Sequence, residues 1–350
     1  MDRFARRAVV GAGMWGTTLA LHLAKHGPVM LLARDEAQAL EIATQRTNER
    51  HLPGINIPVE VEVTADPAAL RSATELVVFA VPAKAMRSSA ERVHADLADD
   101  AVLLSVAKGI EQGSLLRMTQ VLGDVMPEAR GRIGAMSGPN LALEIARGLP
   151  ASAVIAAEDE EISRRASEWI GMRSFRVYRN RDVTGVELCG ALKNIIAIAA
   201  GAAEQLGFGD NGKAGLITRG LAEITRLGIA AGANPLTFAG LAGLGDVIAT
   251  CYSALSRNHA LGVELARGRS WTEIEGTLSG VAEGAYTVTA ALDMARGLGV
   301  EMPIAQEVHN ALFEGKSVQR CLIDLLSREQ KDELAGFEAV WRREVQTPSS

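Results

Sequence analysis

Residues 8–16 read Ala-Val-Val-Gly-Ala-Gly-Met-Trp-Gly, a short apolar run that leads into a Gly-x-Gly-x-x-Gly pattern. An Ala- and Leu-rich helix is predicted directly after it, and a second apolar strand at 29–33. In this context Gly11 permits the tight turn, Gly13 lets a pyrophosphate approach the backbone, and Gly16 lets the helix pack on the strand. The pattern predicts a dinucleotide site at the N-terminus of the first helix.

The basic start of the chain allows a second interpretation. Arg3, Arg6 and Arg7 precede the apolar run, as in a secretory signal. The run, however, holds three glycines in the dinucleotide register, its end is interrupted by His22 and Lys25, and no convincing small-residue cleavage site follows. We therefore favour the dinucleotide site over a signal peptide.

The end of the predicted strand at 29–33 bears on the choice of dinucleotide. An acidic residue there would hold the ribose hydroxyls of NAD, whereas this chain has Arg34 followed by Asp35. Arginine forms bidentate pairs with phosphate and stacks on adenine. Asp35 is also placed to cap a helix predicted over 36–46. The sequence therefore favours NADP(H) and leaves NAD(H) open.

Strands and helices alternate through the first half of the chain. This alternation predicts an α/β fold, a Rossmann-type, mostly parallel sheet with helices on both faces. After Arg181 long Ala-, Leu- and Gly-rich helical patterns dominate. We expect a Rossmann-type NAD(P)-binding domain over 1–181, an all-helical substrate domain over 182–345 and a frayed tail over 346–350. Further strands are predicted at 59–63, 75–81, 101–106, 133–136, 152–156 and 175–178.

Ligands of open α/β sheets bind beyond the carboxyl ends of the strands. Three polar segments follow predicted strands at such ends. Val81-Pro82-Ala83-Lys84 is best explained as the start of a helix. Lys108, in Ala-Lys-Gly at 107–109, is expected to point its charge into the crevice. Residues 137–144, Ser-Gly-Pro-Asn-Leu-Ala-Leu-Glu, form by themselves a plain Gly-Pro turn before a helix.

Lys193 and Asn194 lie in an apolar helical run, Val-Glu-Leu-Cys-Gly-Ala-Leu-Lys-Asn-Ile-Ile-Ala at 186–197. An ammonium group there faces a low dielectric, which is costly without a partner. Small residues share its stripe of the helix and leave room for a bulky ligand. The alternative is close packing on a neighbouring helix, with the lysine reaching water. Both interpretations stay open for this helix alone.

Two polar segments stand out in the helical half. Asp246 lies at a glycine-rich helix entry with Thr250 one turn on, and simple N-capping by Asp246 is the alternative to a functional role. Ser256-Arg257-Asn258 precedes another helix. An arginine and hydrogen-bond donors at a helix start suit a phosphate monoester, whereas a capped surface turn is the alternative.

Composition excludes several other classes. The chain has 350 residues and a net charge of −6, which gives no general attraction to nucleic acid or to an anionic membrane. Its longest apolar stretches are interrupted by glycine or charge, so we expect no membrane insertion. Three scattered cysteines suit reduced thiols in the cytoplasm. The six histidines show no ligand spacing, and no metal is expected.

Taken together, these segments resemble the NAD(P)-dependent sn-glycerol-3-phosphate dehydrogenases of the bacterial biosynthetic type. The similarity covers roughly residues 8–313. The motifs that carry it are Gly-Ala-Gly-Met-Trp-Gly-Thr at 11–17, Ala-Lys-Gly at 107–109, Ser-Gly-Pro-Asn at 137–140, Glu-Leu-Cys-Gly-Ala-Leu-Lys-Asn at 187–194, Leu-Ile-Thr-Arg-Gly-Leu at 216–221, Gly-Leu-Gly-Asp at 243–246, Ser-Arg-Asn at 256–258, Val-Ala-Glu-Gly at 281–284 and Met-Pro-Ile at 302–304.

The resemblance implies a cytoplasmic oxidoreductase that reversibly reduces dihydroxyacetone phosphate to sn-glycerol 3-phosphate for phospholipid synthesis, and it leaves a homodimer open. Lys193 would be the general acid and base, with Asp246 beside it and Lys108 touching both substrate and nicotinamide. Because the free pKa of lysine is about 10.4, burial or a nearby cation should lower it. The implied substrate residues are Lys108, Gly138, Asn140, Lys193, Asn194, Asp246, Thr250, Ser256, Arg257 and Asn258. The implied cofactor residues are Gly11, Gly13, Met14, Trp15, Gly16, Arg34, Lys108, Ala142, Arg257, Val281 and Glu283.

The chain departs from the family pattern at a few positions. Many members have a hydroxyl residue where Asn140 stands, an aromatic residue where Leu141 stands and a leucine where Val247 stands. Two other classes remain as alternatives. One is a related reductase of another ketone or β-hydroxyacid, which would lack the phosphate-binding triplet. The other is a non-catalytic NADPH-sensing protein, which would have no need of the two lysines and the aspartate.

Overall fold

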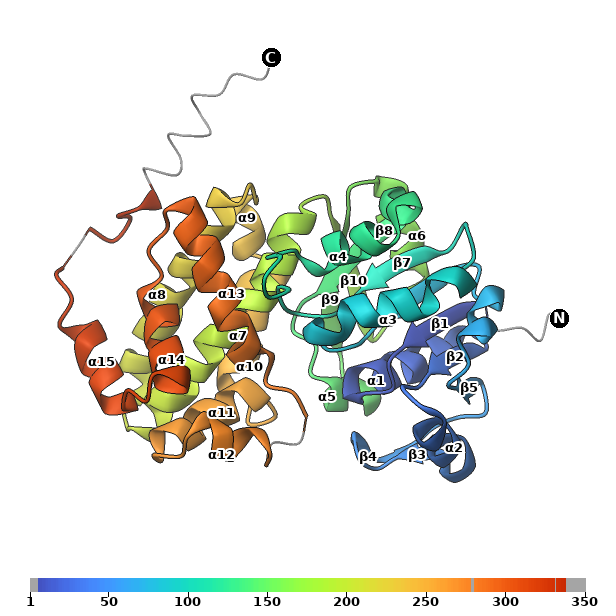
Figure 1. Cartoon of the computed structure of the whole chain (residues 1–350), viewed down its shortest axis with the longest axis horizontal. Coiled ribbons are helices and arrows are strands. Elements are labelled where there is room, and N and C mark those ends of the chain that lie inside the picture. The colour runs from blue at the N-terminus through green and yellow to red at the C-terminus, as the bar shows by residue number, and fades with distance from the viewer. Residues whose placement is uncertain (1–5, 278–279, 331, 338–350) are drawn as a thin grey trace, which may run out of the picture. The chain divides into compact units, whose positions relative to one another are not determined.

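The computed structural model describes residues 6–277, 280–330 and 332–337 of the chain, so the tail predicted at 346–350 and Arg3 lie outside the described residues. The chain divides into two compact units (Figure 1). The first unit comprises residues up to 111 and 116–187, and the second comprises 112–115 and the residues from 188 onward.

An eight-stranded sheet forms the centre of the first unit, in the order β10-β9-β8-β7-β6-β1-β2-β5. From β5 to β8 this is the strand order of a Rossmann fold, with the reversal of chain direction between β1 and β6. All neighbouring strands run parallel except β8 and β9. The strands are β1 (Arg7–Val10), β2 (Val29–Leu32), β5 (Val61–Thr64), β6 (Leu76–Phe79), β7 (Val102–Ser105), β8 (Ile133–Ser137), β9 (Ala151–Ala157) and β10 (Phe175–Asn180). The prediction of a mostly parallel sheet is confirmed.

Alternate side chains of the strands point to opposite faces, and both faces are buried. On one face Val9 and Leu31 pack with residues of α1 (Met14–Leu23), α2 (Glu36–Gln45), α5 (Ala142–Ala146) and α6 (Glu160–Ile170). On the other face Val10 and Phe79 pack with residues of α3 (Met86–Val93) and α4 (Met118–Val125). A small antiparallel hairpin of β3 (Thr47–Asn48) and β4 (Leu52–Asn56) follows α2, where no strand was predicted.

The described part of the second unit is entirely helical, as predicted. Its central helix, α7 (Val183–Gln205), begins in the first unit. The other helices are α8 (Gly209–Ala230), α9 (Pro235–Phe238), a π-helical turn (Leu241–Gly245), α10 (Asp246–Tyr252), α11 (Arg257–Ala266), α12 (Trp271–Glu275), α13 (Glu283–Leu298), α14 (Pro303–Phe313) and α15 (Val318–Leu326).

Helix α7 is long and apolar enough to cross a membrane, as is the segment Pro235–Tyr252. Glycine and charge do interrupt α7, at Glu187, Gly190 and Lys193 among others, but they leave its mean hydropathy high. The apolar window of α7 is completely buried in the protein, which is what the core helix of a folded domain requires. Its small residues allow close packing: a Cβ on Gly201 would lie 2.1 Å from the carbonyl oxygen of His259 in α11.

Candidate active site

The glycine loop at 11–16 joins β1 to α1 in a geometry that requires glycine at two positions. Gly11 has a φ of +108°, and a Cβ there would lie 2.8 Å from the carbonyl oxygen of Ala80. A Cβ on Gly16 would lie 1.8 Å from the carbonyl oxygen of Gly11. Around Gly13, by contrast, a Cβ would meet no atom within 4 Å. The loop thus packs tightly against β6 and stays open at its central glycine.

The first turn of α1 offers backbone donors at this open position. Gly13 is the N-cap residue and supplies no side-chain cap. The first N–H groups of a helix have no partner within the helix, so those of Met14 and Trp15 suit an anion. A pyrophosphate fits the loop because the space in front of Gly13 is open and the helix dipole favours negative charge there.

Arg34 and Asp35 follow β2 and pair with each other, with 2.9 Å between Nε and Oδ2. Asp35 also caps α2, because its Oδ1 accepts the N–H of Gln38, as predicted for this aspartate. These two interactions, the backbone hydrogen bond first, hold the pKa of Asp35 below its ordinary value. Arg34 itself is largely exposed, with 78% of its side chain accessible. Arg92 of α3 donates to the carbonyl oxygens of Ala33 and Arg34 and adds a second guanidinium.

The polar segments that follow β7 and β8 contact each other. Lys108 Nζ donates to the carbonyl oxygen of Gly138 at 3.0 Å. Beside this contact, the Ser137 hydroxyl and the Asn140 side-chain oxygen are buried and have no hydrogen-bond partner within the described chain. Buried polar atoms normally find a partner, so the two atoms indicate a place for a polar ligand. Ala142 begins α5 here, and its carbonyl oxygen accepts from Thr18.

Lys193 is buried in the second unit, with 5% of its surface exposed. Its ammonium group donates to Asp246 Oδ1 at 2.8 Å and to the Thr250 hydroxyl. Thr250 also lies 3.2 Å from the same carboxylate oxygen. Asp246 is 2% exposed and follows the π-helical turn, so its side chain balances the lysine and does not cap α10. The alternatives of a lysine reaching water and of simple capping by Asp246 are therefore wrong.

Cys251 lies next to this cluster in α10, close enough for the charge of Lys193 to act on it. Burial raises the pKa of its thiol to about 12, so the thiol stays neutral. All three cysteines of the chain are buried thiols. Asp246 is therefore the group that balances the Lys193 ammonium.

The Ser256-Arg257-Asn258 triplet begins α11. Ser256 is the N-cap residue, and its hydroxyl accepts the N–H of His259 at 3.2 Å, so the cap proposed as an alternative exists. The triplet is not a surface turn, however, since Ser256 and Asn258 are buried. Asn258 donates to the side-chain oxygen of Asn194 at 2.9 Å and accepts the N–H of Gly284 at 3.0 Å. These bonds join α11 to α7 and α13.

Arg257 points its guanidinium toward Gly280, where a Cβ would lie 2.5 Å from Nη1. Burial lowers the pKa of Arg257, and the nearby Glu283, the first residue of α13, opposes that shift. Within the described residues no hydrogen bond or ion pair of this guanidinium is found, so its donors remain for a ligand. Val281, in the same approach to α13, is half-buried.

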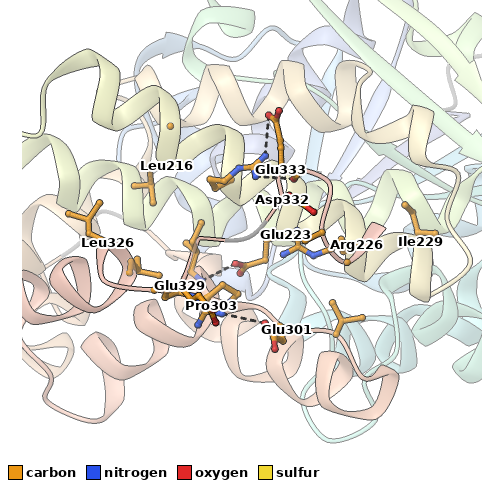
Figure 2. A pocket seen from close by; sticks show the side chains of 18 of the residues that line it. Leu216, Glu223, Arg226, Ile229, Glu301, Pro303, Leu326, Glu329, Asp332 and Glu333 are labelled. Atoms are coloured by element: carbon orange, nitrogen blue, oxygen red, sulfur yellow. Dashed lines mark hydrogen bonds and ion pairs between the residues drawn. The ribbon is translucent and has the colours of Figure 1, made fainter. Parts of the chain in front are cut away.

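A cavity of about 920 Å³ lies along α8 of the second unit, and none of the predicted site residues lines it (Figure 2). Its walls include leucines of α8 and α15 and several charged side chains. Glu223 points into it and accepts the N–H groups of Ile304 and Ala305, each at 2.9 Å. Burial raises the pKa of Glu223 to about 7. Its observed contacts are those of a cap on α14.

Comparison with known proteins identifies the family. Residues 7–163 match the family described as NAD-dependent glycerol-3-phosphate dehydrogenase N-terminus, and residues 182–323 match its C-terminus. The glycerol-3-phosphate dehydrogenase [NAD(P)+] of Streptomyces avermitilis is 45% identical over 95% of this chain and 99% of its own length. That of Citrifermentans bemidjiense is 43% identical over 93% and 98%.

This chain belongs to the NAD-dependent glycerol-3-phosphate dehydrogenase family. The crystal structure of the glycerol-3-phosphate dehydrogenase of Coxiella burnetii has the same fold, with a TM-score of 0.87 and 35% identity over 93% of this chain and all of that one. The chain is therefore an oxidoreductase of a family that uses a nicotinamide dinucleotide. Within the described residues, no group of three or more His, Cys, Asp or Glu side chains could hold a metal ion.

The structure also reveals residues near the proposed sites that sequence analysis missed. Ser137 was quoted in a motif but given no role, although its hydroxyl is buried and finds no hydrogen-bond partner among the described residues. Arg92 follows Arg34 by 58 residues, and no local pattern links the two. The cluster of Glu204, Lys213 and His259 was also missed. The signal that could have revealed this cluster is the pair of opposite charges, Glu204 and Lys213, nine positions apart where α7 ends and α8 begins.

Proposed function

We propose that this chain catalyses the reversible NAD(P)H-dependent reduction of dihydroxyacetone phosphate to sn-glycerol 3-phosphate, as a step toward glycerophospholipids. The observation that carries the proposal is the buried Lys193 ammonium, balanced by Asp246 and Thr250, in a chain that also has an open dinucleotide loop. The names of the relatives point to the same reaction. A binding protein without chemistry has no need to maintain such a costly buried charge.

The proposed cofactor site lies in the first unit. Gly11 and Gly16 hold the loop, while Gly13, Met14 and Trp15 present open space and backbone donors to the pyrophosphate. When bound, the nicotinamide supplies or accepts the hydride. Lys108 and Ala142 lie at the strand ends, where we expect the nicotinamide side. Arg257, Val281 and Glu283 of the second unit complete the proposed cofactor contacts.

The proposed proton donor is Lys193 Nζ. In reduction it gives a proton to the ketone oxygen as the carbonyl carbon receives the hydride, and in oxidation it takes the proton from the alcohol. Asp246 and Thr250 fix the position of the ammonium between transfers, since both accept its hydrogen bonds. Lys108, Gly138, Asn140 and Asn194 are proposed to line the substrate, where the two buried atoms without partners lie at Ser137 and Asn140.

The proposed phosphate site is the start of α11. Arg257 keeps its donors for a ligand and pairs well with a phosphate because its guanidinium is planar and always charged. Ser256 and Asn258 stand beside it at a helix N-terminus, where the dipole favours an anion. A ketone without the phosphate loses these contacts.

We propose that NADP(H) is the preferred cofactor. Arg34 is exposed after the end of β2, and the guanidinium of Arg92, held by the carbonyl oxygens of Ala33 and Arg34, adds a second positive charge there. Asp35 is engaged by Arg34 and by the N–H of Gln38, which makes it a poor partner for the ribose hydroxyls of NAD(H). A 2′-phosphate suits this arrangement better.

The test is NADPH oxidation at pH 7 with dihydroxyacetone phosphate, with unphosphorylated dihydroxyacetone and with NADH as controls. Rapid oxidation with the phosphorylated ketone alone, with sn-glycerol 3-phosphate as product, is the expected result. NADPH binding without oxidation of either ketone would refute the proposed reaction and favour a sensor or a reductase of another ketone.

A further inference from the structure

Glu204, near the C-terminal end of α7, and Lys213 of α8 connect four helices of the second unit. Glu204 Oε2 accepts a hydrogen bond from Lys213 Nζ of α8 and lies 3.2 Å from Nε2 of His259 in the first turn of α11. The Lys213 ammonium also lies 4.3 Å from the ring centroid of Tyr252, the last residue of α10. We call Glu204, Lys213 and His259 the Glu204 cluster.

The Glu204 cluster holds both ends of one short segment. Tyr252 precedes the turn that leads to Ser256, and His259 follows Asn258 directly. The N–H of His259 donates to the Ser256 hydroxyl, so the side chain of His259 and the cap of α11 are fixed by the same residue. The segment between the two contacts carries Arg257. The position of the phosphate-binding triplet therefore depends on the cluster.

The Glu204 cluster contributes more to stability than an ordinary surface ion pair does. Glu204 is 51% exposed, and a pair between two exposed groups contributes little. Lys213, however, is only 8% exposed, and Glu204 is the one hydrogen-bond partner of its ammonium found among the described residues. Removing one partner leaves a buried charge without compensation, which is strongly unfavourable. The hydrogen bond from Lys213, more than the charge of His259, holds the pKa of Glu204 below its ordinary value.

The backbone beneath the cluster leaves little freedom. A Cβ on Gly201 would lie 2.1 Å from the carbonyl oxygen of His259, and one on Gly262 would lie 1.9 Å from that of Ile198. Helix α11 thus packs directly on α7 at both glycines. A close-packed base of this kind transmits a side-chain change to the start of the helix, where the triplet lies.

We propose that Glu204, Lys213 and His259 are positioning residues for the substrate phosphate. They contact no reacting atom and act by holding the Ser256-Arg257-Asn258 turn in the conformation that binds a phosphoryl group. The inference rests on the proposed function, and it assigns to the cluster a contribution to phosphate recognition alone. Proton transfer by Lys193 and cofactor binding by the first unit do not depend on it.

The experiment compares Lys213→Met and Glu204→Gln with wild type, and uses Lys316→Met as the matched control. Lys316 also pairs with carboxylates, those of Glu307 and Asp324, at another place in the second unit. We expect the KM for dihydroxyacetone phosphate and the inhibition constant of inorganic phosphate to rise together by about tenfold, with kcat within about twofold. The KM for NADPH and the Lys316→Met variant should stay at wild-type values.

The outcomes separate the two proposals. A fall in kcat with an unchanged KM, or a loss of phosphate inhibition no greater than in Lys316→Met, would overturn the positioning role while the wild-type reaction stands. Absence of dihydroxyacetone phosphate turnover in wild type would overturn the proposed function and this inference with it. Glu204→Gln keeps the measurement decisive if Lys213→Met fails to fold, because the half-exposed glutamine can still accept the Lys213 hydrogen bond through its amide oxygen.

Discussion

The glycine loop of the first unit and the lysine cluster of the second unit are built in opposite ways. The loop presents backbone N–H groups, and all its parts lie within residues 11–16. The lysine cluster presents side chains, and Lys193 reaches its partner Asp246 across 53 residues of sequence. A site made of backbone depends on the absence of side chains, whereas a site made of side chains depends on the packing of several helices.

This difference predicts how each site fails. A substitution in the loop places a side chain either against backbone atoms or in the space for the ligand. Which of the two occurs depends on the position of the substitution within residues 11–16. A substitution in the lysine cluster leaves a buried partner without compensation, so that catalysis and stability change together. The following variants are designed to test that contrast, from the largest expected effect to the smallest.

The two glycines of the loop should give opposite results. Gly16→Ala places a Cβ 1.8 Å from the Gly11 carbonyl oxygen, and we expect a loss of about 3 kcal/mol or more in the free energy of unfolding. Gly13→Ala meets no atom within 4 Å and only replaces a glycine N-cap by alanine, so its stability should fall by no more than about 1 kcal/mol while NADPH binding weakens about tenfold. Urea unfolding and fluorescence titration with NADPH measure the two effects. Equal stabilities of the two variants would contradict the loop geometry.

Asp246→Asn should lower kcat by about 100-fold, because the amide still contacts Lys193 but no longer balances or aligns its charge. Thr250→Val is the matched control, since it removes one hydrogen bond to the same ammonium without removing a charge. Its kcat should fall only a few-fold. Steady-state assays with dihydroxyacetone phosphate compare the two variants, and an Asp246→Asn enzyme with wild-type kcat would remove this aspartate from the mechanism.

Arg34→Ala should weaken NADPH binding by about tenfold, a loss of about 1.4 kcal/mol for one exposed charged contact. NADH lacks the 2′-phosphate, so its dissociation constant should change less than about twofold. Titration of both cofactors gives the ratio directly. If both constants shifted equally, Arg34 would contact the adenine or ribose common to the two cofactors and would not select NADP(H).

Glu223 lies outside both sites, so its substitution should have the smallest effect on cofactor binding and turnover, whereas the pH dependence of stability should change. Burial raises its pKa from 4.5 to about 7, so the folded protein takes up a proton that the unfolded chain does not hold between these values. The contribution of Glu223 to stability is thus full below pH 4.5 and is lost as the pH rises to about 7. Glu223→Gln does not titrate. Urea unfolding at pH 5 and pH 8 measures the free energy of unfolding of both proteins. The free energy of wild type should fall relative to that of Glu223→Gln at the higher pH. The same difference in free energy at both pH values would refute the raised pKa.

The same contrast explains which features the sequence reveals. The glycine loop, the cap by Asp35 and the eight strands of the main sheet follow from local patterns, and the structure has them where they were predicted. The antiparallel pairing of β8 with β9 was not predicted, because an apolar run such as 151–157 does not encode the direction of its neighbour. The β3–β4 hairpin was missed since its two strands are short and polar.

The side-chain clusters were only partly predictable. Lys193 was conspicuous because it is a charge within an apolar helix, whereas for Asp246 simple N-capping was the alternative to a functional role. The structure distinguishes capping from a functional role, because the π-helical turn that precedes α10 makes Gly245 the N-cap residue and Asp246 the first residue of the helix. Nothing local linked Glu204 to His259, which lies 55 residues further on. The buried atoms without partners at Ser137 and Asn140 are visible only once the fold is known.

The most direct test of this account is to measure the NADPH dissociation constant and kcat on one preparation of Lys193→Ala. The account assigns cofactor binding to the glycine loop and proton transfer to the lysine, so it predicts a dissociation constant within about twofold of wild type. It also predicts a kcat lower by about 1,000-fold or more with dihydroxyacetone phosphate. A kcat within tenfold of wild type would show that Lys193 is not the proton donor and would contradict the account.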